Sequence, residues 1–142
     1  MKKLFDASAI ILLAKNNPQE VAELLKNNFI LDLTVYEIGN TIWKLNKILK
    51  NEGRDIAVEA IKQAQNLLAL MDKCENAETL ISIMDNAFQY NLTYYDSAYL
   101  TAADDQKLAL ITEDKKLEKA ASNANIHTYN IEKMLESSNR YS

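Results

Sequence analysis

Short apolar runs alternate with amphipathic segments along the chain. The runs predict strands over residues 2–6, 29–33, 108–112 and 126–129. Between them, apolar residues recur three and four positions apart, which is the spacing of one helix face. Alternation of strand and helix predicts an α/β fold, rich in helix, in which a central parallel sheet of about four to five short strands carries helices on both faces.

Local residue chemistry sets the expected starts of the first helices. Ser8 is expected to cap the first helix, because a serine hydroxyl accepts from free backbone N–H groups. Pro18 follows Asn17 and is expected to begin the second helix. Thr34 is expected to cap a third helix, which should end near Gly53.

The second half of the chain contains further segments with helical periodicity. Residues 56–71 and 77–90 are expected to pack against each other as a helical hairpin. The apolar residues expected to face the core in this hairpin are Ile61, Leu68, Ile81, Met84 and Phe88. Another helix is expected to begin near Tyr95, and a later one to cover residues 114–124.

The composition is that of an ordinary globular chain. The 142 residues are 48% hydrophobic and 25% charged, which predicts a single domain over residues 1–142 with a core of its own. The 16 basic and 20 acidic residues give a net charge of −4. No overall basic field therefore attracts nucleic acid, and any polyanion must be bound locally.

Cysteine and histidine use narrows the possible chemistry. Cys74 is the only cysteine and His127 the only histidine, so a zinc site or a catalytic triad lacks partners. We expect His127 to be a half-exposed strand residue, and we expect a reducing, cytoplasmic setting. The early apolar run over residues 9–14 is too short to span a membrane, and no targeting segment is visible.

Four acidic residues lie where predicted strands end or helices begin. Asp6 closes the first strand, and Glu37 lies in the first turn after the second. Asp96 opens a later helix, and Asp114 follows the strand over residues 108–112 by two positions. Each acid alone also suits a helix N-terminus, where it caps N–H groups and complements the helix dipole. Capping does not require the acids to share one end of the sheet, whereas a ligand crevice beyond the strands does.

Clustered carboxylates require a counterion. Two carboxylates about 5 Å apart repel by about 3 kcal/mol at an effective dielectric constant of about 20. All-oxygen ligation favours Mg²⁺ or Mn²⁺ over zinc, and magnesium sites recruit phosphate oxygens. A metal ion also lowers the pKa of a bound water, so the predicted chemistry is hydrolysis of a phosphate ester that needs no histidine base.

Four short motifs follow one another along the chain: LFDASAI, TVYEIGN, TYYDSAYLTAA and LITEDKKL. Their order and spacing resemble the four motifs of PIN-domain nucleases, and the size resembles the VapC-type toxins of VapBC toxin–antitoxin pairs. The resemblance implies a PIN-like three-layer fold and a Mg²⁺- or Mn²⁺-dependent endoribonuclease that leaves a 5′-phosphate and a 3′-hydroxyl. It also implies a small antitoxin partner and a homodimer.

The resemblance assigns roles to individual positions. The residues that match the family's metal-binding and water-activating acids are Asp6, Glu37, Asp96 and Asp114. Ser8 and Thr112 match small hydroxyl residues that support these acids. Asn40, three positions after Glu37 on the same helical face, matches a polar residue that orients the site.

Basic and aromatic residues near the acids are candidate RNA contacts. Lys115, Lys116 and Lys119 lie beside Asp114, where they either hold phosphates or form a solvated helix face. The side chains of Tyr94, Tyr95 and Tyr99 either stack on unpaired bases or pack in the core or at an interface.

Other functions and families remain open or are disfavoured. The alternatives to a toxin are a non-cleaving PIN-like protein that binds RNA or a partner, and an RNA-processing nuclease outside a toxin pair. Tyr36 and Trp43, seven positions apart, suit a dimer surface or an antitoxin groove. Haloacid-type phosphatases need a second aspartate at position 8, which is Ser8 here, and receiver domains need a late-strand lysine that we do not find.

Overall fold

Within residues 1–75 and 79–139, the part of the chain that the computed structural model describes, five strands form one central sheet. The strands follow the order β3-β2-β1-β4-β5, and all neighbours are parallel. Each is short: β1 (Lys3–Phe5), β2 (Phe29–Ile30), β3 (Asp72–Lys73), β4 (Ala109–Ile111) and β5 (Thr128–Tyr129). Because the strands are parallel, their carboxyl ends share one edge of the sheet.

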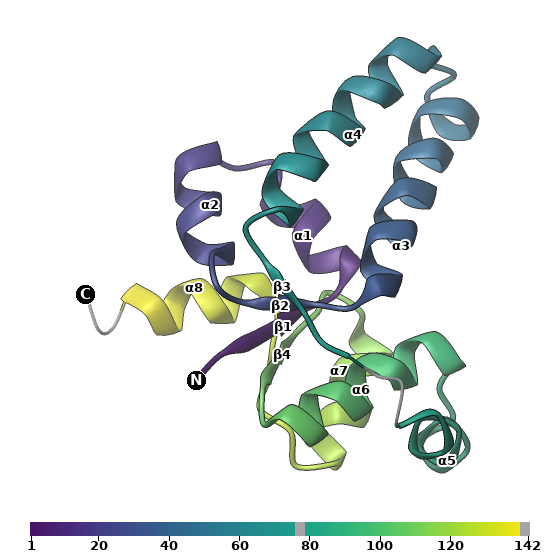
Figure 1. Ribbon diagram of the computed structural model, residues 1–142, viewed down its shortest axis with the longest axis vertical. Coiled ribbons are helices and arrows are strands. Elements are labelled where there is room, and N and C mark those ends of the chain that lie inside the picture. Colours follow the sequence, from purple (N-terminus) through teal and green to yellow (C-terminus); the bar gives the residue numbers. More distant parts are fainter. Residues whose placement is uncertain (76–78, 140–142) are drawn as a thin grey trace.

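Helices cover both faces of the sheet, as Figure 1 shows. One layer contains α1 (Ala7–Leu13), α2 (Pro18–Leu25), α3 (Asp32–Trp43), α4 (Arg54–Leu68) and α8 (Ile131–Asn139). The other contains α5 (Leu80–Tyr90), α6 (Tyr94–Gln106) and α7 (Lys115–Asn123). The π-helix η1 (Lys44–Leu49) extends α3, which projects beyond the sheet together with α4. The predicted helix-rich, three-layer α/β fold is confirmed.

The central strand separates two hydrophobic clusters. Leu4 and Phe5 in β1 are both fully buried and point to opposite faces, as alternating strand residues do. Leu4 packs with α6 and α7, whereas Phe5 packs with α1, α2 and α8. Burial on both faces fixes the register of β1 and thereby the position of Asp6, the first residue beyond it.

Two predicted helix caps are wrong. Asp6, rather than Ser8, caps α1: its Oδ1 accepts from the backbone N–H of Ala9 at 2.9 Å. Thr34 lies buried inside α3, where its Oγ1 accepts from the backbone N–H of Leu31 at 3.0 Å. At α1 an aspartate two positions before Ser8 is the cap, whereas α3 begins after Leu31, which has no side-chain cap hydrogen bond. The predicted start of α2 at Pro18 is confirmed.

The predicted helical hairpin is also wrong. α4 packs on α3 and α5 packs on α6, in opposite layers of the fold. The strand between them, β3, consists of the exposed residues Asp72 and Lys73 and has no apolar pattern that reveals it. The predicted start of the second hairpin helix, residue 77, lies outside the described residues. α8 has no counterpart among the predicted elements.

The apolar face of α5 is oriented differently from the prediction. Ile81, Met84 and Phe88 are 79%, 47% and 82% exposed, whereas Ile83 and Ala87 are buried. In α4, Leu68 packs against the core as predicted and Ile61 is half-buried. Helical spacing thus shows which residues of α5 share a face, but not which face packs against the rest of the protein.

Two further expectations concern the rest of the chain. His127 is exposed, but it lies one residue before β5 rather than within the strand. Across residues 1–75 and 79–139, no helix combines the length and the apolar character that crossing a bilayer requires.

Candidate active site

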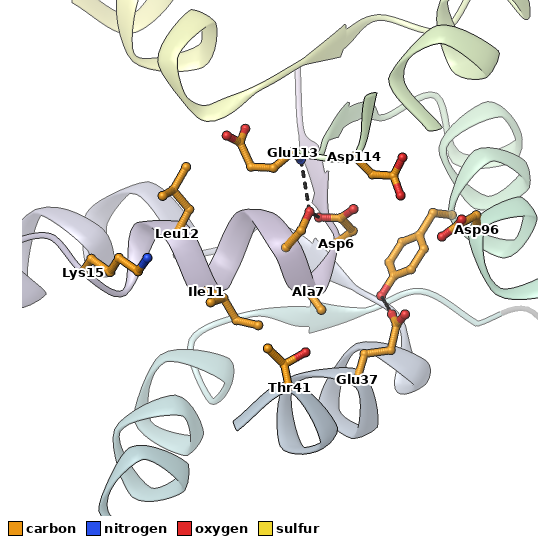
Figure 2. Close-up of a pocket in the computed structure, with 12 residues that line it drawn as sticks. Asp6, Ala7, Ile11, Leu12, Lys15, Glu37, Thr41, Asp96, Glu113 and Asp114 are labelled. Carbon is orange, nitrogen blue, oxygen red and sulfur yellow. Dashed lines mark hydrogen bonds between the residues drawn. The ribbon is translucent and has the colours of Figure 1, made fainter. Parts of the chain in front are cut away.

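A cavity of about 490 Å³ opens beyond the carboxyl ends of β1 and β4. All four predicted acids line it, and Figure 2 shows their side chains around one space: Asp6, Glu37, Asp96 and Asp114. Asp6 follows β1, Glu37 comes from α3, Asp96 from the first turn of α6, and Asp114 caps α7. The topology therefore brings together residues from four separate parts of the chain.

Asp6 is the most confined of the four acids. Its side chain is 6% exposed, and both carboxylate oxygens accept hydrogen bonds. The Oδ1 atom accepts from the hydroxyl of Ser8 at 2.6 Å and from the N–H of Ala9, while Oδ2 accepts from the hydroxyl of Thr112. The carboxylate is therefore held in one orientation by groups from α1 and from the end of β4.

The segment after β4 connects the first acid to the last. The N–H of Asp114 donates to Thr112 Oγ1 at 3.0 Å, and the N–H of Glu113 donates to Ser8 Oγ at 3.0 Å. Asp114 Oδ1 in turn accepts from the first N–H groups of α7, at 2.9 Å and 3.1 Å. The predicted supporting residues Ser8 and Thr112 both lie in this network, each bridging Asp6 to the backbone of the β4–α7 connection.

Glu37 is oriented by a chain of hydroxyl groups. The hydroxyl of Tyr99 donates to Glu37 Oε1 at 2.5 Å and lies 2.8 Å from Thr34 Oγ1. Since Tyr99 uses its proton on Glu37, Thr34 donates to Tyr99 and accepts from the N–H of Leu31. Tyr99 is 1% exposed, so the core-packing alternative describes it and base stacking does not.

Burial and mutual repulsion raise the pKa of three of the acids. Burial is the largest cause of the raised pKa of Asp6, and the charge of Asp114 adds to it. Burial also raises the pKa of Glu37, with contributions from the charges of Asp6 and Asp96, while the hydrogen bond from Tyr99 lowers it. The pKa of Asp96 is raised first by burial and then by the charge of Asp114. The four carboxyl groups therefore act on one another across the cavity.

The donor set fits a hard divalent cation. The acids offer only carboxylate oxygens, and their mutual repulsion is relieved by a positive charge between them. Within residues 1–75 and 79–139, no group of three or more His, Cys, Asp or Glu side chains is placed so that it could hold a metal ion by itself. An open arrangement of carboxylates suits magnesium, which keeps several waters and takes further oxygens from a phosphate.

Comparison with known proteins decides the family. The PIN domain pattern matches residues 3–123. This chain belongs to the PIN domain family. It is 32% identical over 114 residues to a protein named Exonuclease VapC9 from Pyrobaculum aerophilum, covering 80% of this chain and 81% of that protein. It is 28% identical over 123 residues to Ribonuclease VapC3 from the same organism, covering 82% and 92%.

A solved structure agrees with the PIN assignment. The crystal structure of PAE2754 from Pyrobaculum aerophilum superimposes with a TM-score of 0.82 and 27% sequence identity, covering 96% of this chain and 94% of that chain. The resemblance to PIN-domain proteins of the VapC type is thus confirmed, and the central parallel sheet is the one expected of a PIN fold.

Other residues that were predicted to belong to this PIN site lie outside its cavity. Asn40 is exposed and does not line it, although Thr41, the next residue in α3, does. Lys115, Lys116 and Lys119 are exposed on α7 and do not line it either. The charge of Lys116 nevertheless lowers the pKa of Asp96, one of the four acids.

Two functional residues were missed by sequence reasoning. Tyr99 was considered for stacking but not as the partner of Glu37, from which it is 62 positions distant. Lys15, two residues after α1, lines the acidic cavity. No sequence signal marks Lys15, because its place in the cavity depends on how α1 packs.

Proposed function

We propose that this PIN-domain protein is a metal-dependent endoribonuclease that hydrolyses RNA phosphodiester bonds by means of a metal-activated water. The observation that supports this most is the convergence of four carboxylates in one cavity, with raised pKa values for Asp6, Glu37 and Asp96. The relatives named Exonuclease VapC9 and Ribonuclease VapC3 support a nuclease.

The residues that would hold Mg²⁺ or Mn²⁺ are Asp6, Glu37, Asp96 and Asp114. Such an ion, when bound, lowers the pKa of water and neutralises charge on a phosphate. Asp6 offers an oriented carboxylate because Ser8 and Thr112 hold its two oxygens. Tyr99 fixes one oxygen of Glu37 and leaves the other directed to the cavity.

We also propose that the protein is the toxin of a type II toxin–antitoxin pair, with a small antitoxin protein as partner, and that it forms a homodimer in the cytoplasm. The VapC names of the relatives support the pairing. Tyr36 and Trp43 in α3 are 76% and 53% exposed and offer apolar surface to a partner. The presence of a neighbouring gene for a small DNA-binding protein would distinguish the toxin from a free-standing processing nuclease.

The decisive experiment incubates purified protein with structured RNAs in Mg²⁺, Mn²⁺ or EDTA. Each RNA is supplied in linear end-labelled and in circular form, together with DNA of the same sequence. Asp6→Asn and Asp96→Asn variants are run in parallel to exclude a contaminating ribonuclease. We expect cutting of circular RNA in Mg²⁺ or Mn²⁺, no cutting in EDTA, and at least a hundredfold loss of rate in both variants.

Each other outcome contradicts a stated part of the proposal. Cutting of linear but not circular RNA identifies an exonuclease, and preference for DNA changes the substrate class. Equal behaviour of wild type and both variants in every metal contradicts the nuclease and leaves a binding protein.

A further inference from the structure

The acidic cavity has a second end that is cationic. Its lining runs along α1 from Asp6 to Lys15, and Figure 2 shows the lysine at the far end from the four acids. Ile11 and Leu12 lie between the two ends. A fifth acid, Glu113, also lines the cavity, and its Oε2 accepts from the backbone N–H of Ile131. The cavity therefore has an end with four acids, an apolar stretch along α1 and a lysine at the other end.

The spacing of the two ends follows from helix geometry. α1 rises by about 9 Å over its seven residues, and Lys15 lies two residues beyond it. A lysine side chain can extend back along the helix surface while keeping its ammonium group in water. Because of this separation along α1, the ammonium group of Lys15 is too far from Asp6 to serve as the counterion of the buried carboxylate. It nevertheless faces the same cavity.

Lys15 has no structural task that explains its position. In the described part of the chain its ammonium group takes part in none of the ion pairs or side-chain hydrogen bonds, and the residue is exposed. Four carboxylates repel an incoming polyanion, and the chain as a whole carries a net charge of −4. A cation in the same cavity offsets that repulsion for the part of the substrate that it faces.

We propose that Lys15 binds a backbone phosphate of the RNA one or two nucleotides from the phosphate that is cut, and that Ile11 and Leu12 face the nucleoside between them. This inference rests on the proposed function, because it places the cut phosphate at the four acids. Lys15 then fixes the register of the RNA strand across the site. Its contact acts on substrate binding more than on the chemical step, so its loss raises KM more than it lowers kcat.

The test combines Lys15→Ala with RNA oligonucleotides in which one phosphate at a time is replaced by an uncharged methylphosphonate. In wild type, we expect one position near the cut site at which the replacement raises KM about threefold to tenfold, as for one exposed charge-assisted contact. In Lys15→Ala that position is expected to lose its effect, while replacements elsewhere keep theirs. Lys15→Arg is expected to restore the wild-type pattern.

Lys26→Ala is the matched control. Lys26 is an exposed lysine that ends α2, next to the start of β2 and thus at the opposite edge of the sheet. The Lys26→Ala substitution removes the same charge as Lys15→Ala but does not alter the cavity lining. If Lys26→Ala raises KM as much as Lys15→Ala, or if the methylphosphonate effect survives in Lys15→Ala, the inference is wrong.

Binding measurements separate this inference from the proposed function. The same oligonucleotides are titrated by fluorescence anisotropy in the Asp96→Asn background, where the RNA is expected to stay intact. RNA that binds but is never cut by the wild-type protein contradicts the nuclease, and the Lys15 comparison is then made on Kd. If no RNA binds at all, both proposals are wrong.

Discussion

Thr112 controls the orientation of the most buried acid. It is fully buried, donates to Asp6 Oδ2 and accepts from the N–H of Asp114. Thr112→Val keeps the shape of the side chain and removes both hydrogen bonds. Because the buried carboxylate keeps its desolvation cost after losing a donor, we expect the free energy of unfolding to fall by about 1–3 kcal/mol. Urea denaturation measures this change, and RNA cleavage should fall with it.

Thr128→Val provides the comparison for that prediction. Thr128 lies in the neighbouring strand β5, is half-buried, and its hydroxyl donates only to the local carbonyl of Ile126. We expect this variant to stay within about 0.5 kcal/mol of wild type. Equal losses in both variants would mean that the bond to Asp6 contributes nothing particular.

The raised pKa values predict how stability depends on pH. A carboxyl group whose pKa is higher in the folded state than in the unfolded state stabilises the fold below the unfolded pKa, about 4, and loses that contribution as pH rises through the folded pKa. Asp96 is such a group. In EDTA, Asp96→Asn should therefore melt at a higher temperature than wild type at pH 7, and this difference should shrink towards pH 4.

The control for the pH prediction is Asp55→Asn, because Asp55 is fully exposed on α4. Its melting temperature should follow that of wild type at both pH values. Adding Mg²⁺ should remove the advantage of Asp96→Asn, since a bound cation relieves the repulsion that the substitution relieves. Thermal denaturation followed by circular dichroism measures these melting temperatures. If Asp96→Asn differs from wild type by the same amount at pH 4 and pH 7, the result counts against the shared acidic site.

At the scale of elements, Glu113 fastens the last helix to the site. Its Oε2 accepts from the backbone N–H of Ile131 at 3.0 Å, at the start of α8. Ile131 and Met134 are buried against the cluster that contains Phe5. Glu113→Ala removes this cap, and we expect a loss of about 0.5–2 kcal/mol together with faster hydrogen exchange in α8.

Two variants isolate the cap from the charge. Glu113→Gln keeps an acceptor for the Ile131 N–H, so its α8 amides should exchange nearly as slowly as those of wild type. Glu132→Ala removes an exposed acid from the first turn of the same helix and should leave the packing of α8 unchanged. If the α8 amides exchange at the same rate in all three variants, packing alone holds α8 in place.

The sequence predicts elements well where residue chemistry is local. Asn17 and Pro18 define the start of α2, and Asp114 defines the start of α7. β3 escapes prediction because its two residues are polar and exposed, and they join the sheet by pairing with β2. The incorrect hairpin follows from the same omission, because β3 lies between α4 in one layer and α5 in the other.

The candidate site follows the same rule. The four acids and their hydroxyl partners Ser8 and Thr112 are predictable because they occupy the ends of elements, where a parallel sheet gathers them. Tyr99 and Lys15 are not, because their roles depend on which helix faces which, and that depends on packing between distant residues.

At the scale of the whole molecule, α5 presents an uncovered apolar face. Its members, 47% to 82% exposed, are Leu80, Ile81, Met84 and Phe88. Contiguous apolar surface of this kind marks an interface with another protein. If α5 forms the proposed homodimer, light scattering should give twice the monomer mass for wild type and the monomer mass for Ile81→Ser combined with Phe88→Ser.

The substituted α5 residues make little contact with the core. The double variant should therefore unfold at the same denaturant concentration as the wild-type monomer. Trp43→Ser tests the other exposed apolar site, on α3. A dimer that survives the α5 substitutions and dissociates in Trp43→Ser moves the interface to the projecting α3–α4 pair.

The contact between Thr112 and Asp6 joins residues that are 106 positions apart. During translation the chain is made from its amino end, so Asp6 is made before β4 and before Thr112 and Asp114, which follow β4. A growing chain therefore lacks the hydroxyl that orients its first acid and one of the four carboxylates. The proposed cutting of RNA therefore requires that β4 has been made and has paired with β1.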